Sequence, residues 1–303
     1  MPTENRVIRI DFLQEIISFD EKEGIVEAYL IPNPDRYERK KIDGEDGYWD
    51  KFDRIFFTMK TVMDSLSLDK EIPIYYSPPK IENSDGYILS RIEAIKQMES
   101  GTESFKFKDS SEEFLENLKK DKMRFVILSI DLKGSTKMSQ ELTCRENAEI
   151  ITLFLREMTL IADKFNGYVL KYLGDGLIAY FPEPNFIGMN DNAIDCAVTM
   201  KKMIVYGLNS ILETRGLPAL DFRIGLDETI NLAVKIQSRA KSKEILMGES
   251  VVESLYTFWR QRLEMIKDMD GWDYKDKKSG EIYAIYTLLD SDLKSSKEVR
   301  LKA

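Results

Sequence analysis

The chain has 303 residues, of which 43% are hydrophobic and 11% aromatic, which is enough apolar material for a packed core and excludes a disordered chain. Its 44 basic and 53 acidic residues give a net charge of −9, which argues against broad binding to nucleic acid or to an anionic membrane. The complete absence of histidine excludes histidine zinc sites, Ser-His-Asp triads and histidine acid–base catalysis. No apolar run is long enough to span a bilayer and the N-terminus lacks an apolar signal core, so we expect a cytoplasmic protein without a membrane partner.

Residues 1–110 mix short β-like runs with charged segments and contain no catalytic motif. We expect a small α/β region there, of regulatory or structural role. Its expected elements are strands at Val7–Phe12, Gly24–Leu30 and Ile72–Tyr76, a turn at Gly44–Asp50, helices at Lys51–Leu66 and Tyr87–Met98, and a linker at Gly101–Ser111.

Residues 111–290 are expected to form a second domain, in which predicted strands and helices alternate over Met123 to Leu289, which is typical of an α/β sandwich with helices on one face of a sheet. Residues 291–303 are a polar C-terminal tail. The expected helices are Glu112–Lys120, Ser139–Phe165, Asp191–Leu212, Thr229–Ala240 and Ser250–Phe258. The expected strands are Phe125–Ile130, Tyr168–Leu173, Leu177–Phe181, Leu220–Gly225, Glu244–Met247, Leu263–Ile266 and Ile282–Leu288.

The stretch from Phe125 to Thr136 places a carboxylate, Asp131, at the end of an uncharged apolar strand and just before a glycine turn and a helix. A strand, a glycine turn and a helix start point backbone N–H groups at an anion. A carboxylate in that position would repel phosphate unless a cation lies between them, and Mg²⁺ prefers one or two carboxylates plus phosphate oxygens. Ser135 by itself is also explained as an ordinary helix N-cap.

A second stretch, Gly167 to Phe181, has the pattern of a β-hairpin with Asp175 between two glycines at its tip. Taken alone, Asp175 is a turn residue. Together with Asp131 it suggests two carboxylates at neighbouring strand ends, which can hold a pair of metal ions for in-line displacement at phosphorus.

The sequence at these places resembles the catalytic domain of class III nucleotidyl cyclases, the adenylate and guanylate cyclases with a ferredoxin-like α+β fold and a mostly antiparallel sheet. The resemblance rests on D-L-K-G-S-T, K-Y-L-G-D-G, F-R-I-G and I-N-L-A-V-K in that order, and covers roughly Met123 to Leu289. It implies that Asp131 and Asp175, with the adjoining Leu132, hold two Mg²⁺ or Mn²⁺ ions. It also implies that Lys133, Gly134, Ser135 and Thr136 bind the β- and γ-phosphates.

The resemblance further implies a base-reading role for Lys171, for which a solvated strand lysine is the alternative. Tyr172 stands where the family more usually has a small polar residue, and an aromatic ring there would narrow the base pocket in favour of a pyrimidine. Lys278 lies in a turn, 275–278, where the family often places a triphosphate-binding lysine, although a solvated loop explains it equally well.

Three further candidates share one helix face at one-turn spacing: Asn231, Lys235 and Arg239. In the family an asparagine orients the ribose, and an arginine four residues later neutralises charge on the α-phosphate. Here Lys235 occupies the arginine position, and lysine supplies the charge without the bidentate fork of arginine. Arg239, one turn further, is a candidate to supply that fork instead. The alternative is that all three residues lie on a solvated helix face.

Only five residues, L-D-E-T-I, separate Gly225 from Asn231, where the family has a hairpin that carries the second base contact. Either this hairpin is deleted or the sequence omits a loop. If it is deleted, Asp227 and Glu228 are the candidates to replace the contact.

These observations favour an enzyme that converts a nucleoside triphosphate to a 3′,5′-cyclic monophosphate and pyrophosphate. The family's sites lie between two chains, so a homodimer is implied. The base stays open between purine and, by analogy with bacterial antiphage systems, pyrimidine. One alternative is a weak or inactive module that binds nucleotide and dimerises. Another is a polymerase-like or diguanylate-forming enzyme, but the hairpin here lacks the tandem acidic turn of that family.

Overall fold

The computed structural model describes residues 10, 12–20, 25–34, 36–51, 55–65, 79–81, 83–97, 110–117, 124–182, 189–255, 257–260, 262–276 and 279–289. The chain divides into two compact units, Met1–Tyr75 and Tyr76–Ala303. The division lies upstream of the boundary expected near residue 110, because helix α2 (Ser84–Gln97) contributes buried side chains to the core of the second unit.

The first unit contains two small antiparallel sheets and one helix. Strands β1 (Phe12–Asp20) and β2 (Ile25–Pro32) form a hairpin. Strands β3 (Tyr37–Ile42), β4 (Glu45–Asp50) and β5 (Ile55–Thr58) form a meander that leads into α1 (Met59–Ser65).

Two predictions in this unit are wrong. The expected turn at Gly44–Asp50 is strand β4, and the chain turns at Asp43 and Gly44, whose φ angles are 53° and 86°. The expected helix at Lys51–Leu66 begins only at Met59, because Ile55–Thr58 pairs with β4 as β5. The expected strand at Ile72–Tyr76, residues 101–109 of the linker, and most of Val7–Phe12 lie outside the described residues.

The second unit is built on a seven-stranded sheet in the order β11-β12-β10-β9-β6-β8-β7. All neighbours are antiparallel except β9 and β10, which are parallel. The prediction of a mixed α/β fold with a mostly antiparallel sheet is confirmed. The strands are β6 (Phe125–Leu132), β7 (Tyr168–Tyr172), β8 (Gly176–Pro182), β9 (Phe222–Asp227), β10 (Glu244–Gly248), β11 (Leu263–Ile266) and β12 (Ile285–Leu288).

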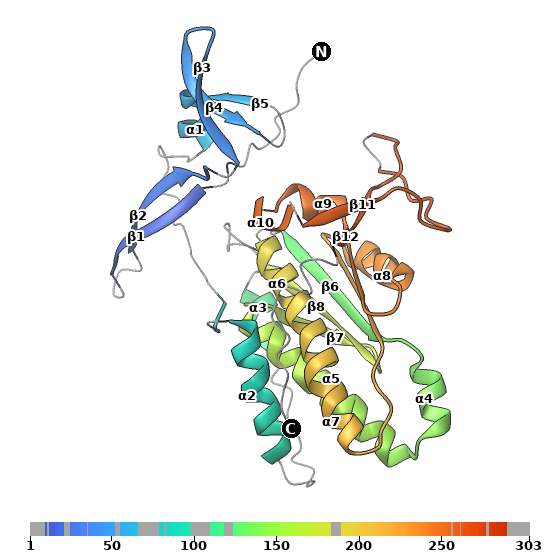
Figure 1. Cartoon of the computed structure of the whole chain (residues 1–303). Helices are drawn as coiled ribbons and strands as arrows, with labels where there is room; N and C mark the ends of the chain where they lie inside the picture. The colour runs from blue at the N-terminus through green and yellow to red at the C-terminus, as the bar shows by residue number, and fades with distance from the viewer. Residues whose placement is uncertain are drawn as a thin grey trace. The chain divides into compact units, whose positions relative to one another are not determined.

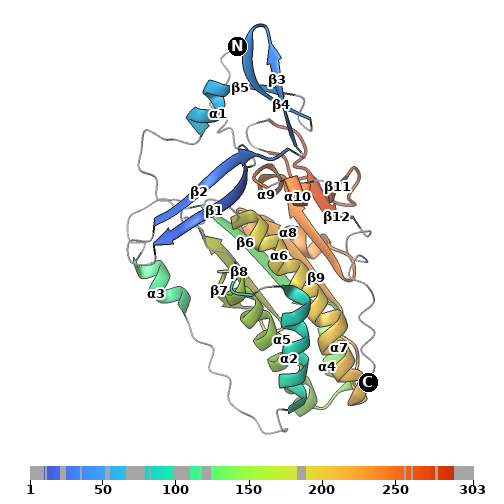
Figure 2. The same ribbon diagram turned by 60° about the vertical axis from the view of Figure 1, so that its left-hand side comes forward.

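The two faces of this sheet carry different helices (Figures 1 and 2). Helices α2, α5 (Cys144–Lys164), α6 (Met189–Lys202) and α7 (Asn209–Thr214) bury the main core against one face. Helix α8 (Ile230–Arg239) packs on the opposite face, where Ala233 belongs to a buried cluster with Ile127, Ile178 and Tyr180. This opposite face is called the α8 face below.

Helix α2 is held to the helical layer by polar contacts as well as by apolar packing. The Arg91 guanidinium donates two hydrogen bonds of 2.9 Å to Glu157, a fully buried carboxylate on α5. Lys202 on α6 pairs with Asp85 at 2.8 Å, and the hydroxyls of Ser84 and Thr199 lie 2.7 Å apart. Arg156 also donates to Glu157, at 3.0 Å, so two arginines together offset the cost of burying this carboxylate.

Three predicted helices are interrupted in the structure. The helix expected at Ser139–Phe165 is two helices, α4 (Ser135–Glu141) and α5, because Thr143 caps α5 in a capping box with Glu146. The helix expected at Asp191–Leu212 is α6 and α7 joined by a π-helical segment, Met203–Leu208. The helix expected at Ser250–Phe258 is split into α9 (Glu249–Glu253) and α10 (Thr257–Arg260). Helix α3 (Ser110–Asn117) precedes the sheet, and no helix in the described part of the chain is long and apolar enough to cross a bilayer.

Candidate functional site

Asp131 and Asp175 lie side by side at one end of the paired strands β6 and β8. In the strand register Asp131 is opposite Gly176, the residue after Asp175. The Leu132 N–H donates to the Asp175 carbonyl oxygen at 3.2 Å, which continues the pairing into the hairpin tip. The two aspartates are thus brought together by main-chain pairing.

Gly176 is required for this close approach. A Cβ atom at position 176 would lie 2.4 Å from the Ile130 carbonyl oxygen and 3.0 Å from the Cα of Asp131. No side chain fits at those distances, so the glycine lets the hairpin tip contact the strand that carries Asp131.

The two carboxylates differ in their partners. Arg223, directly opposite Asp131 on β9, donates from Nε to Asp131 Oδ1 at 3.2 Å and from Nη2 to Oδ2 at 2.9 Å. The carboxylate of Asp175 has no side-chain partner among the described residues. Sequence reasoning missed Arg223, although its place in the F-R-I-G strand could have revealed it once β9 was paired antiparallel to β6.

The donor set fits a divalent cation. Asp131 and Asp175 offer carboxylate oxygens, and the main chain at Leu132, the residue after Asp131, carries a carbonyl oxygen of the kind that such ions also bind. No group of three or more acidic or cysteine side chains that could hold a metal occurs in the described part of the chain. The remaining ligands would therefore come from water or from substrate phosphates, as Mg²⁺ prefers.

The turn after β6 brings the predicted phosphate-binding residues to the same end of the sheet. The Lys133 N–H donates to the Asp221 carbonyl at 2.8 Å, which fixes the start of the turn. Gly134 has φ of 80° and is the N-cap of α4, and Ser135 is the first helical residue. The N-cap explanation for Ser135 is therefore wrong, since Gly134 holds that position. Thr136 follows on α4 and is exposed, as is Lys133.

Lys171 and Tyr172 point to opposite faces of the sheet. Lys171 is opposite Ile178, whose side chain packs on the α8 face, and it is exposed on the face that carries Asp131. The Tyr172 hydroxyl lies 3.0 Å from Thr159 Oγ1 on α5, and its ring packs against the main core. Lys171 therefore lies on the sheet face that carries Asp131, whereas the Tyr172 ring lies on the helical side.

Helix α8 presents Asn231 and Lys235 to solvent, one turn apart, while Leu232, Ala233 and Ile236 are buried beneath them. Lys235 Nζ lies 5.8 Å from the centre of the Tyr274 ring. Both predicted side chains thus stand on the outer surface of α8, away from the sheet of their own chain. They are accessible to a ligand or to a second chain.

Arg239, the third candidate on α8, is engaged by the loop before β12. It donates to the carbonyl oxygens of Asp270 at 3.1 Å and Gly271 at 2.7 Å. Gly271 has φ of 64°, and a Cβ there would lie 2.7 Å from Arg239 Nη1. These contacts give Arg239 a role in fixing the loop.

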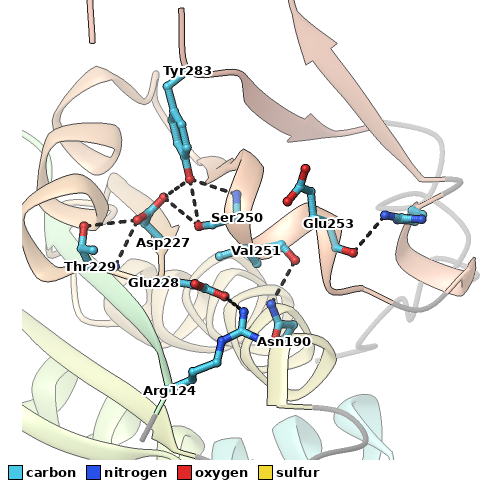
Figure 3. Close-up of polar contacts among 10 residues, drawn as sticks. Arg124, Asn190, Asp227, Glu228, Thr229, Ser250, Val251, Glu253 and Tyr283 are labelled. Atoms are coloured by element: carbon cyan, nitrogen blue, oxygen red, sulfur yellow. Dashed lines mark hydrogen bonds and ion pairs between the residues drawn. The ribbon is translucent and has the colours of Figure 1, made fainter. Parts of the chain in front are cut away.

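The short connection between β9 and α8 is closed by a buried polar network (Figure 3). Asp227 is 1% exposed and accepts hydrogen bonds from the Tyr283 hydroxyl at 2.7 Å and from the Thr229 N–H at 3.0 Å. The Ser250 N–H donates to the Tyr283 hydroxyl at 2.9 Å. Thr229 caps α8 in turn, accepting from the Leu232 N–H.

The network shows that the chain passes directly from strand to helix, with no hairpin between them. Burial raises the pKa of Asp227 above its usual value, and hydrogen bonds from Tyr283, Thr229 and Ser250 oppose that rise. Glu228 forms an ion pair with Arg124. Asp227 and Glu228 are therefore both engaged by other side chains and do not replace the family's second base contact.

Lys278, the last predicted substrate contact, lies outside the described residues together with Lys277. Nearby, Lys275 forms a β-bridge with Ile282, and the Asp276 N–H donates to the Glu281 carbonyl. The role of Lys278 in triphosphate binding stays a prediction.

No protein-family model matches the sequence. An adenylate cyclase from Anabaena cylindrica is 26% identical over 158 residues, covering 44% of this chain and 31% of that protein. The resemblance to class III nucleotidyl cyclases is confirmed. The match spans less than a third of the relative's length, so the activity, substrates and partners of this cyclase-like chain are proposals.

The cyclase-like chain is also similar to solved cyclase structures. The guanylyl cyclase Cya2 is 18% identical, with a TM-score of 0.46, over 55% of this chain and 92% of that one. The adenylyl cyclase CyaB from P. aeruginosa is 21% identical, with a TM-score of 0.45, over 56% of this chain and 95% of that one.

Proposed function

We propose that residues 111–290 form a nucleotidyl cyclase, which converts a nucleoside triphosphate to a 3′,5′-cyclic monophosphate and pyrophosphate. The observation that supports this most is the pair of carboxylates, Asp131 and Asp175, brought together at one sheet end by β6–β8 pairing. Lys171 lies on the same sheet face as Asp131, and the unit resembles an adenylate cyclase in sequence.

Asp131, Asp175 and the Leu132 carbonyl would hold two divalent cations, Mg²⁺ or Mn²⁺, which acidify the ribose 3′-hydroxyl and neutralise the triphosphate. The turn from Lys133 to Thr136 would bind the β- and γ-phosphates through backbone N–H groups. The 3′-oxygen would attack the α-phosphorus as the bond to the β-phosphate breaks. Such a reaction depends on positioning and electrostatics and needs no protein nucleophile.

Asn231 and Lys235 are proposed to complete the site of a second chain in a homodimer. Their exposed positions on the outer surface of α8 support this, because the side chains face away from their own sheet. In that arrangement Asn231 orients the ribose and Lys235 offsets charge on the α-phosphate. Lysine supplies the charge without the bidentate geometry of arginine, so a modest turnover rate is expected.

The base is the least constrained part of the proposal. Lys171 supplies one contact, and the β9–α8 connection supplies no hairpin for a second. The argument for a pyrimidine from Tyr172 loses its support, because that ring packs on the helical side of the sheet. A pyrimidine product and an antiphage role therefore stay hypotheses, and we expect weak selection between bases.

A turnover assay tests the proposal. The full chain is incubated with Mn²⁺ and separately with ATP, GTP, CTP or UTP, and products are identified by mass spectrometry beside Asp131→Asn and the surface control Asp163→Asn. A cyclic monophosphate made by the wild type and the control, and lost in Asp131→Asn, is the expected result. Absence of product from all four nucleotides, with metal-dependent nucleotide binding intact, would favour the non-catalytic binding module instead.

A further inference from the structure

The pairing of Arg223 with Asp131 has a consequence for metal binding that goes beyond the proposed reaction. Both oxygens of Asp131 already accept a hydrogen bond from the arginine fork, at 3.2 and 2.9 Å. Bidentate arginine–carboxylate pairs are among the stronger and more directional polar contacts in proteins. Asp131 is thus neutralised by the protein itself.

The surroundings make this pair more than a loose surface contact. The side chains of Arg223 and Asp131 are only 25% and 28% exposed. They are directly opposite each other in the β6–β9 register, so main-chain pairing fixes their separation. Partial burial reduces solvent screening, which strengthens both the attraction within the pair and the repulsion between the guanidinium and any added cation.

Arg223 also has a second acceptor. Its Nη1 donates to the Ser238 carbonyl oxygen at 3.2 Å, in the last turn of α8. Carbonyl groups at a helix C-terminus carry partial negative charge and attract cations. The guanidinium can therefore release an Asp131 oxygen and still keep a partner.

Asp175 offers the contrast, because its carboxylate has no side-chain partner in the described part of the chain. An incoming cation meets one open carboxylate and one that is already occupied. The asymmetry predicts that the two aspartates do not become metal ligands with equal ease.

We propose that Arg223 is a built-in counter-ion of Asp131, which occupies this carboxylate in the metal-free protein and yields at least one oxygen when a divalent cation binds. The inference rests on the proposed function in taking Asp131 as a metal ligand. Arg223 is then a positioning residue that lowers metal affinity until a triphosphate adds negative charge. Metal loading is thereby coupled to the arrival of substrate.

The test is a Mn²⁺ titration of the full chain without nucleotide, in which free Mn²⁺ is followed by electron paramagnetic resonance. Arg223→Gln removes the charge and is expected to bind Mn²⁺ roughly tenfold more tightly than the wild type. Arg223→Lys restores the charge and should return the affinity most of the way to the wild-type value. Arg145→Gln removes a charge from an 81% exposed side chain and should change nothing.

Two further measurements sharpen the result. The Mn²⁺ affinity gained by Arg223→Gln should be lost again in the double variant with Asp131→Asn. A non-hydrolysable triphosphate should narrow the difference in Mn²⁺ affinity between Arg223→Gln and the wild type. Equal or weaker Mn²⁺ binding by Arg223→Gln, with urea unfolding showing an intact fold, would overturn the proposal, as would a gain that survives Asp131→Asn. The Mn²⁺ titration contains no nucleotide and the triphosphate measurement requires no turnover, so a failure to find any cyclic product would leave these outcomes intact and would count only against the proposed function.

Discussion

The carboxylate end of β6 and β8 and the α8 helix are assembled by different physical means. At the carboxylate end, main-chain pairing and one glycine bring Asp131 and Asp175 together. At α8, a buried network around Asp227 holds the short connection from β9 and sets where the helix begins. The two halves of the candidate site should therefore respond to different changes.

The largest effect is expected where the metal ligands are removed. Asp175→Asn keeps the size of the side chain but removes its charge, and it should lower turnover at least about 100-fold. No loss of stability is expected, because the Asp175 carboxylate has no side-chain partner among the described residues. Turnover in Mn²⁺ and urea unfolding measure the two quantities. Asp163→Asn, on an exposed surface pair with Lys80, is the control and should keep wild-type turnover. Near-normal turnover of Asp175→Asn would remove this aspartate from the site.

A glycine substitution at the same end of the sheet tests how much the close approach of β6 and β8 contributes to stability. Gly176→Ala places a Cβ 2.4 Å from the Ile130 carbonyl, so we expect the free energy of unfolding to fall by about 2–4 kcal/mol. Gly280→Ala, where φ is 73° but no atom lies within 4 Å of the new Cβ, should cost only about 1–2 kcal/mol. Urea unfolding compares the two, and equal losses would mean that the close strand approach is unimportant.

Removing one hydrogen-bond donor from the buried network around Asp227 should destabilise the connection between β9 and α8. Tyr283→Phe leaves Asp227 without its shortest hydrogen bond, 2.7 Å, and should cost about 1–3 kcal/mol of unfolding free energy. Tyr206→Phe, on a 56% exposed side chain, should be neutral.

The same variant should change the pH dependence of stability. Burial raises the pKa of Asp227, so the folded chain binds this proton more tightly than the unfolded chain. The corresponding stability is present below about pH 4 and is lost as the pH rises through the folded pKa. Because the Tyr283 hydrogen bond opposes the rise in pKa, Tyr283→Phe should enlarge that loss in urea unfolding measured from pH 4.5 to 7.5. An unchanged pH profile would mean that Asp227 does not titrate with folding.

The smallest change in turnover is expected from substitutions of Lys235 on α8. Lys235→Arg adds a bidentate donor and should raise turnover a few-fold, whereas Lys235→Ala should lower it by about tenfold. Lys137→Arg, on a 79% exposed side chain of α4, is the matched control. Equal rates for the arginine, lysine and alanine forms would place residue 235 outside the site.

The carboxylate end could be predicted from the sequence because its signals are local. An apolar run that stops at Asp131, and an Asp-Gly pair between apolar runs, specify a strand end and a hairpin tip. The α8 half was harder to predict, because its contacts join residues far apart in sequence, such as Asp227 with Tyr283. At the carboxylate end the Arg223–Asp131 pair was missed for the same reason.

Helix boundaries were missed for a related reason. The capping box that separates α4 from α5 is visible at Thr143 and Glu146, but the apolar spacing suggested one continuous helix. In the first unit, Ile55–Thr58 matches a helical pattern, and only its pairing with β4 shows it to be a strand. Tertiary pairing overrides local periodicity at such places.

One measurement tests most directly whether the two halves work together across two chains. Asp131→Asn and Asn231→Ala, each inactive alone, are mixed, unfolded and refolded together, and assayed for cyclic product. Random pairing into homodimers and heterodimers predicts recovery of about a quarter of the wild-type rate, because half of the dimers then contain one intact site. No recovery above the separate variants, with mixed dimers detected by native mass spectrometry, would contradict a site shared between chains.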